Sequence, residues 1–203
     1  MIGTKRVVSI YTEATPNPET MKFVLNKMLY AQNSADFPTR EDAEGASKLA
    51  ISLFDEFPYV KGVFIMNNFV TVTKTPTTEW FEVVPDIREF IRGYVENEGE
   101  IINEEVLRQK LAEKPGGDPN EVNENDSEIE AKIKELIKTY VQPAVEMDGG
   151  SIVCRSYDEG IVYLGMQGSC SGCPSSTVTL KAGIEGLMKR MIPEIKAVEA
   201  EMM

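Results

Sequence analysis

Gly168-Ser169-Cys170-Ser171-Gly172-Cys173-Pro174-Ser175-Ser176 is the stretch around which the second half of the chain is organised. The sequence predicts a strand before it, from Ile161 to Met166, and a helix after it, from about Ser176. Both cysteines then lie on a loop at a helix N-terminus, where unpaired N–H groups and the helix dipole favour negative charge. That environment favours the thiolate, the form of cysteine that binds metals and attacks disulfides.

The spacing of the two cysteines fits a shared metal centre. Only Ser171 and Gly172 separate Cys170 from Cys173, so the backbone can curl and both sulfurs can reach one metal. A closed tetrahedral zinc site or a cubane iron–sulfur cluster takes four ligands, and this loop supplies two of them. Two copies of the chain, facing each other across a two-fold axis, would supply all four. The sequence therefore predicts a ligand-bridged homodimer with a partly exposed centre that is easily released.

The composition of the chain excludes several classes of function. The 203 residues carry a formal net charge of -12, which argues against nucleic acid or an anionic membrane as the main partner. No apolar run approaches the roughly 20 residues that span a bilayer. Histidine is absent, which removes Ser-His-Asp catalysis, Cys-His catalysis and histidine-ligated metal sites.

Cysteine usage and the N-terminal sequence lead to an expected location. Three cysteines, an odd and small number, do not form a secreted disulfide framework. The sequence from Met1 to Val8 leads directly into a strand-like pattern, without the features of a signal peptide or a transit segment. The expected location is cytoplasmic.

The first half of the sequence predicts an α+β domain, one sheet with helices packed against it. The predicted elements are strands at Val7–Glu13 and Met21–Leu25, a helix at Glu41–Phe57, a hairpin at Val63–Thr73 that turns at Asn67-Asn68, and a helix that begins near Pro85. The buried face of the last helix is expected to comprise Ile87, Phe90, Ile91, Tyr94 and Val95.

The second half predicts a compact αββαβ unit. A capping box at Ser127 and Glu130 begins a helix that Pro143 interrupts and Gly149-Gly150 ends. Strands at Ser151–Tyr157 and Ile161–Met166 follow, then the cysteine loop, a helix with Leu180, Ile184, Leu187, Met188 and Met191 on one face, and a strand at about Ile195–Ala200.

The overall prediction is therefore α+β, with two small domains that each contain a mainly antiparallel sheet and packed helices. The first domain covers residues 1–112 and the second covers residues 127–203. Residues 113–126, rich in Pro, Gly, Asp and Glu, are predicted to form a flexible acidic linker.

Two sets of residues resemble a known family. Met147-Asp148-Gly149-Gly150, followed by the cysteine stretch from Gly168 to Thr177, resembles the C-terminal domain of NifU, which Nfu-type iron–sulfur cluster scaffold and carrier proteins share. Thr15-Pro16-Asn17-Pro18, with Met21-Lys22-Phe23, resembles the N-terminal domain of the same Nfu proteins. Together these resemblances cover nearly the whole chain outside the linker. The chain lacks the cysteine-rich scaffold and ferredoxin-like regions of full-length nitrogen-fixation NifU.

The resemblance implies a function without a catalytic residue. It implies that Cys170 and Cys173 ligate a 4Fe–4S cluster between two subunits, and that the cluster is delivered to apo-proteins. The expected partners are a second copy of the chain, apo iron–sulfur client proteins and upstream cluster donors, and no enzyme activity is expected.

Other interpretations of the same residues stay open at this point. Strand, Cys-x-x-Cys-Pro and helix in succession also describe a thiol–disulfide oxidoreductase that uses Cys170 and Cys173, although the motif follows a hairpin instead of lying within a βαβ unit. A structural zinc site between two chains and an interaction module with idle thiols are further alternatives. Cys154, on the same strand face as Ile152, is expected to pack in the core. Asp148-Gly149-Gly150 is expected to act mainly as a helix terminator.

Overall fold

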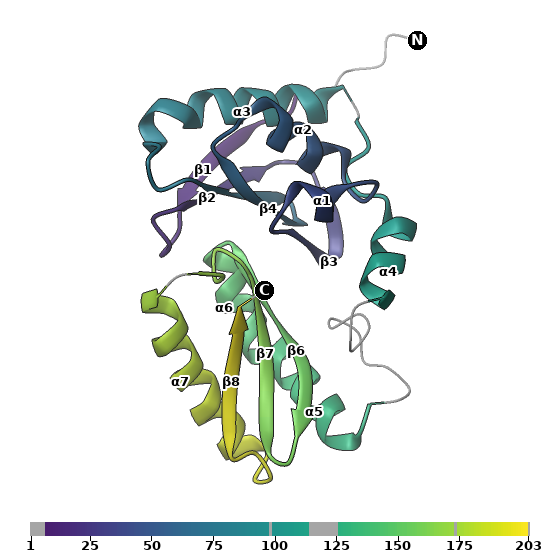
Figure 1. Ribbon diagram of the computed structural model, residues 1–203, viewed down its shortest axis with the longest axis vertical. Helices are drawn as coiled ribbons and strands as arrows, with labels where there is room; N and C mark the ends of the chain where they lie inside the picture. Colours follow the sequence, from purple (N-terminus) through teal and green to yellow (C-terminus); the bar gives the residue numbers. More distant parts are fainter. Residues whose placement is uncertain (1–6, 98, 114–125, 173, 203) are drawn as a thin grey trace. The chain divides into compact units, whose positions relative to one another are not determined.

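The structure is a computed structural model, and it describes residues 7–97, 99–113, 126–172 and 174–202 (Figure 1). The chain divides into two compact units, residues 1–107 and 108–203. The predicted linker at 113–126 lies almost wholly outside the described residues, so its flexibility stays a prediction. Among the described residues, no helix is both long enough and apolar enough to cross a membrane.

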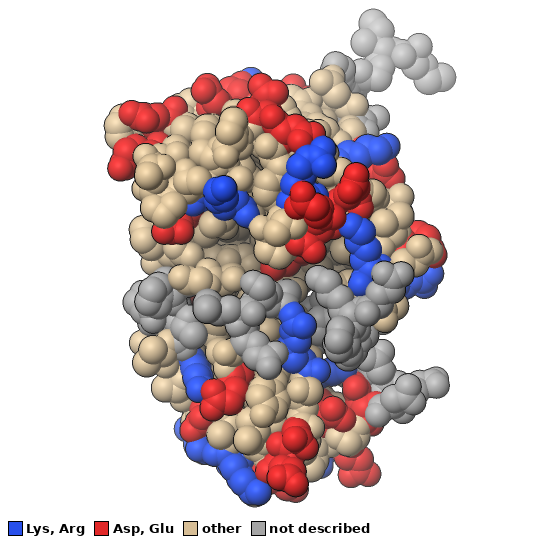
Figure 2. All heavy atoms as spheres, in the orientation of Figure 1, with Lys and Arg blue, Asp and Glu red and all other residues tan. Residues whose placement is uncertain are grey.

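The N-terminal unit contains one antiparallel sheet covered by helices, as predicted. Its five strands are arranged in the order β1-β2-β5-β4-β3, and every neighbouring pair is antiparallel. The strands are β1 (Ile10–Ala14), β2 (Thr20–Leu25), β3 (Tyr30–Phe37), β4 (Val60–Asn67) and β5 (Phe69–Lys74). The helices are α1 (Arg40–Ala43), α2 (Lys48–Glu56), α3 (Trp80–Glu96) and α4 (Glu104–Glu113), and α4 crosses the division between the two units. In Figure 2, acidic side chains gather along the α3 edge of this unit.

The predicted hairpin is confirmed, and Asn67 explains its turn. Met66 pairs with Phe69, which leaves a connection of two residues, Asn67 and Asn68. Asn67 has a φ of 47°, in the left-handed region that asparagine tolerates better than most residues.

The helix predicted at Glu41–Phe57 is two helices, α1 and α2. Gly45 separates them with a φ of +71°, a conformation that interrupts a right-handed helix. Ser47 then begins α2, because its side chain accepts a hydrogen bond from the backbone N–H of Ala50 at 3.1 Å.

Helix α3 begins at Trp80, five residues before the predicted start at Pro85. The indole Nε1 of Trp80 donates to the carbonyl of Pro18 at 2.9 Å and anchors the start of the helix on the turn between β1 and β2. Ile87, Ile91 and Val95 are buried as predicted, whereas Phe90 and Tyr94 are only half-buried.

The C-terminal unit has the predicted αββαβ order. Its elements are α5 (Glu128–Leu136), the π-helical turn η1 (Ile137–Val141), α6 (Gln142–Met147), β6 (Gly150–Asp158), β7 (Ile161–Gly168), α7 (Pro174–Met191) and β8 (Ala197–Met202). The capping box is present: the Ser127 N–H donates to the Glu130 carboxylate at 2.8 Å, and the Glu130 N–H donates to Ser127 Oγ at 3.2 Å.

Pro143 interrupts the first helix of this unit as predicted. The proline has no N–H to donate, and immediately before it the N–H of Gln142 bonds to the carbonyl of Ile137 in a π-type turn. The extra residue in this turn shifts the helix face, and Tyr140 is 58% exposed.

The sheet of the C-terminal unit is mixed. β6 and β7 pair antiparallel, while β7 and β8 pair parallel and are connected through α7. The cysteine loop therefore lies inside a β7–α7–β8 crossover, a βαβ unit. The prediction that the motif lies outside such a unit was wrong, because strand direction is set by the crossover helix and not by local sequence.

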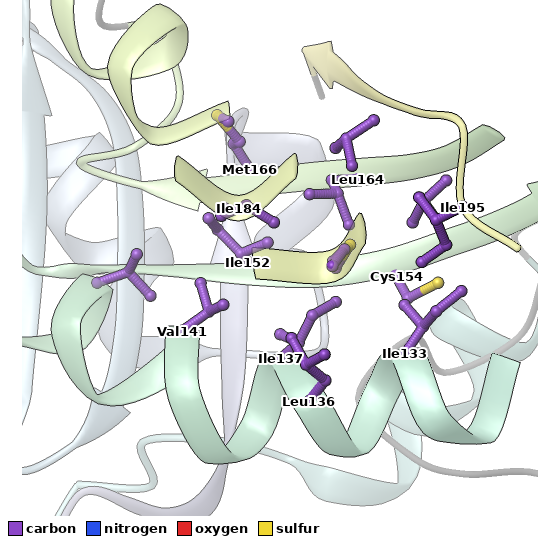
Figure 3. Close-up of a cluster of buried hydrophobic side chains, with 14 of the residues drawn as sticks. Ile133, Leu136, Ile137, Val141, Ile152, Cys154, Leu164, Met166, Ile184 and Ile195 are labelled. Carbon is purple, nitrogen blue, oxygen red and sulfur yellow. The ribbon is translucent and has the colours of Figure 1, made fainter. Parts of the chain in front are cut away.

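One face of this sheet and the helices form the core (Figure 3). Alternate strand residues on this face contact apolar side chains from the helical segment 128–147 and from α7. The residues labelled in Figure 3 are Ile133, Leu136, Ile137, Val141, Ile152, Cys154, Leu164, Met166, Ile184 and Ile195. Met188 is fully buried in this core, but Met191, which was expected there, is 55% exposed at the end of α7.

Candidate functional site

The cysteine loop begins where β7 ends. Gly168 and Gly172 have φ values of 61° and 72°, and these two left-handed residues flank Cys170. Tight turns connect them: the Cys170 N–H donates to the Gln167 carbonyl at 3.3 Å, and the Ser171 N–H donates to the Gly168 carbonyl at 3.1 Å. Helix α7 then begins at Pro174, two residues before the predicted start, with proline in the first helical position that it favours.

The Asp148-Gly149-Gly150 segment ends helix α6, as predicted. Gly149 has a φ of 82°, and its N–H donates to the carbonyl of Glu146 at 3.0 Å, a common way to end a helix. The same segment has a second role that the sequence did not indicate. Ser169 donates from its hydroxyl to the carbonyl of Asp148 and from its N–H to the carbonyl of Gly149 at 3.2 Å. The segment that ends α6 thus also fixes the cysteine loop through these two hydrogen bonds.

Cys170 packs directly against the start of β6. Gly150 pairs with Gly168, and a Cβ added at Gly150 would lie 2.7 Å from the Cys170 sulfur. Because that distance is far below van der Waals contact, only glycine leaves room for the sulfur. Cys170 is 4% exposed and belongs to the core of the unit.

Gln142, at the start of α6, secures the other side of this strand. Its side-chain oxygen accepts hydrogen bonds from the Ser151 hydroxyl at 3.2 Å and from the Ile152 N–H at 3.4 Å. The sequence prediction missed Gly150, Ser169 and Gln142 as parts of the site. The glycine pair Gly149-Gly150 was the available signal, but only the pairing register shows which residue it faces.

Cys154 lies in the core, as predicted, and its environment makes it a poor ligand. The side chain is 3% exposed, and burial raises the pKa of its thiol to about 11, although the charge of Lys134 opposes that shift. Cys154 lies four positions after Gly150 along β6, which is about 13 Å at the usual strand rise. Cys154 therefore cannot join Cys170 at one metal, and no disulfide connects these two cysteines.

Cys173, the second predicted ligand, lies outside the described residues. The roles of Cys170 and Cys173 as ligands therefore stay predictions. Within the described ranges, no three Cys, Asp or Glu side chains converge in a way that could hold a metal ion.

Family models match both units of the chain. The model described as "Scaffold protein Nfu/NifU N terminal" matches residues 10–98, and the model described as "NifU-like domain" matches residues 133–199. A solution structure of a NifU-like protein from Saccharomyces cerevisiae is 27% identical, covers 51% of this chain and 90% of its own, and superposes with a TM-score of 0.44.

Curated relatives match over almost the whole chain. NifU-like protein 4, mitochondrial, of Arabidopsis thaliana is 40% identical over 98% of this chain and 68% of its own length. The NFU1 iron-sulfur cluster scaffold homologs, mitochondrial, of Homo sapiens and Drosophila willistoni are 38% and 39% identical over 97% and 98% of this chain. The chain spans 73% of the human relative and 65% of the Drosophila relative.

These comparisons overturn the predicted location and confirm the resemblance to Nfu proteins. All three are named as mitochondrial proteins, so the expected cytoplasmic location is wrong. The resemblance of both halves to Nfu proteins is confirmed by the two family models and by the identity to the relatives. The chain belongs to the NifU-like family, with an Nfu/NifU N-terminal domain ahead of the NifU-like domain that contains the cysteine loop.

Proposed function

We propose that this protein is an iron–sulfur cluster scaffold and carrier, in which two copies share a 4Fe–4S cluster through Cys170 and Cys173 of each chain. The names of the human and Drosophila relatives, as iron-sulfur cluster scaffold homologs, support the scaffold role. The observation that carries the shared cluster is the burial of Cys154. Because this third cysteine is fixed in the core, each chain has two thiols left for a cluster that needs four.

The cluster is cargo in this proposal, and its transfer is a ligand exchange. Each thiol loses its proton to solvent as its sulfur binds iron. In transfer, a client thiolate forms a new bond to iron while the bond to Cys170 or Cys173 breaks, and the freed thiolate takes up a proton. The cluster keeps its oxidation state, so the step needs no oxidant or reductant and no catalytic residue.

The partners follow from this exchange. Apo-proteins with vacant cysteine ligands would accept the cluster, and upstream donors would supply it to a pair of chains. The N-terminal unit would select among these partners, and residues 113–126 would give it reach.

Anaerobic reconstitution of the full chain tests the proposal. The loaded protein should be brown and absorb near about 400 nm, as expected for thiolate-ligated iron. Cys170→Ala and Cys173→Ala should each lose the cluster, while Cys154→Ala, the matched control, should keep it. Full iron and sulfide content in the Cys170→Ala, Cys173→Ala double variant would refute the ligand assignment.

A thiol–disulfide oxidoreductase is the second candidate, and one structural feature favours it. The Cys-x-x-Cys loop lies within the β7–α7–β8 crossover, which is the setting of a thioredoxin-like motif. This candidate predicts catalytic reduction of a protein disulfide such as insulin, in a sample free of iron. The scaffold proposal predicts no turnover in that assay.

A further inference from the structure

The backbone at the start of β6 forms a seat for the Cys170 sulfur. A Cβ on Gly150 would lie 2.7 Å from Cys170 Sγ and 2.7 Å from the carbonyl oxygen of Gln167. Ordinary van der Waals contact begins at 3.4 Å, so the sulfur would have to retreat by about 0.7 Å (3.4 minus 2.7) if residue 150 were alanine. We call this position of the sulfur the Gly150 seat.

The residue before the cysteine holds the loop over the seat. Ser169 is 2% exposed, and it donates hydrogen bonds to the carbonyls of Asp148 and Gly149, immediately before the seat. The segment that forms the seat therefore also fixes the chain that occupies it. With Sγ in the seat, Cys170 is 4% exposed.

In the Gly150 seat the Cys170 sulfur is buried, so it cannot bind a cluster that is shared with a second chain. The iron of a shared cluster must reach the sulfur from outside the unit. Gly168 and Gly172 flank Cys170 in the left-handed region, and a Cβ on Gly172 would meet no atom of the described residues within 4 Å. These two glycines are the places where the backbone can turn to present the sulfur.

Starting from the proposed function, we propose that Gly150 is a positioning residue for cluster release. Gly150 leaves room for a buried position of the Cys170 sulfur. The sulfur can either occupy this position or bind the cluster, so the two states compete. A protein whose binding-competent state is only partly populated binds its ligand less tightly by that fraction. The seat therefore loosens the hold on the cargo and shields the thiol once the cargo has left.

Thiol reactivity in the apo protein tests the seat without any cluster. Gly150→Ala should increase the rate of Cys170 alkylation by iodoacetamide about fivefold or more, because fewer molecules would hold the sulfur in the buried position. The rate is measured by mass spectrometry of the peptide that contains Cys170. Gly183→Ala is the matched control: a Cβ there would meet nothing within 4 Å in the part of the chain that the structure describes, and the rate should not change. An unchanged rate in Gly150→Ala would contradict the claim that the Cys170 sulfur is protected in the Gly150 seat.

Cluster release tests the competition. The loaded full chain is mixed with an iron chelator, and the loss of visible absorbance is followed. Gly150→Ala should retain its cluster several times longer than the natural chain, and Gly183→Ala should match the natural chain. Faster loss in Gly150→Ala would overturn the competition. If the natural chain bound no cluster, the proposed function would fail, while the alkylation result would still decide the seat.

A stability measurement covers the case in which Gly150→Ala weakens the fold. Cys170→Ala removes the sulfur and leaves the backbone contact with Gln167. The urea midpoint should therefore fall less when Gly150→Ala is added to Cys170→Ala than when it is added to the natural chain. Equal losses in the two backgrounds would show that the sulfur does not occupy the seat.

Discussion

The pH dependence of stability should reveal the state of Cys154. Burial raises the pKa of this thiol from its ordinary value of 9.0 to about 11, so the folded protein holds its proton more tightly than the unfolded chain does. The contribution to stability is complete below pH 9 and is lost as the pH rises toward 11, because the unfolded chain ionises first.

Linkage gives the magnitude of this loss. With one proton site and these two pKa values, the free energy of unfolding falls by about 1 kcal/mol at pH 10 and by about 2 kcal/mol at pH 11. Cys154→Ala lacks the thiol and escapes this loss. The stability difference between the natural chain and Cys154→Ala should therefore shift in favour of the variant by these amounts, whatever its value at pH 7.

Urea unfolding at pH 7, 9, 10 and 11 measures the difference, with far-UV circular dichroism for the C-terminal unit. Trp80, the single tryptophan of the chain, lies in the N-terminal unit, so its fluorescence provides an internal reference that should be the same in both proteins. Ionisable groups that do not interact with Cys154 affect both proteins equally. Parallel stability curves from pH 7 to 11 would refute the assignment of Cys154 as a buried neutral thiol.

Three further changes test other parts of the structure. Ser127→Ala removes the capping box and should destabilise the C-terminal unit by about 1 kcal/mol in urea unfolding, whereas Ser127→Thr should retain most of the stability; equal losses would argue against the cap. Gly45→Ala places a side chain at a φ of +71° and should cost the N-terminal unit about 1 kcal/mol, seen as a lower midpoint of Trp80 fluorescence; an unchanged midpoint would contradict the break between α1 and α2. Ser169→Ala removes the hydroxyl bond to Asp148 and should speed alkylation of Cys170; no change in rate would show that this bond does not hold the loop.

Much of the fold could be predicted because its signals are local. The Asn67-Asn68 turn and the box at Ser127 and Glu130 each depend on residues a few positions apart. Strand β3, Tyr30–Phe37, was missed because it carries Gln32, Asn33, Ser34 and Asp36 and has no apolar run. It is an edge strand, held by its pairing with β4.

Features that depend on distant contacts could not be predicted from local patterns. The start of α3 at Trp80 rests on a hydrogen bond to Pro18, 62 residues earlier. The parallel pairing of β8 with β7 depends on the path of α7. This helix spans 18 residues and returns the chain to the end of the sheet at which β7 begins.

The candidate site shows the same division. The cysteine pair was predicted as a pair of metal ligands from its spacing, because two thiols three positions apart can reach one metal, and from its place at a helix N-terminus. The place of Cys170 against Gly150 could not be predicted, since it depends on the pairing of Gly150 with Gly168 across the hairpin. The sequence therefore predicts which sulfurs bind the cluster, and the fold shows where the Cys170 sulfur lies.

Native mass spectrometry of the anaerobically reconstituted full chain, with iron and sulfide counts, tests the central claim most directly. A pair of chains should hold one 4Fe–4S cluster, and chelation of the cluster should remove the iron from that pair. A single chain that holds a complete 4Fe–4S cluster, with no added small thiol, would contradict the account.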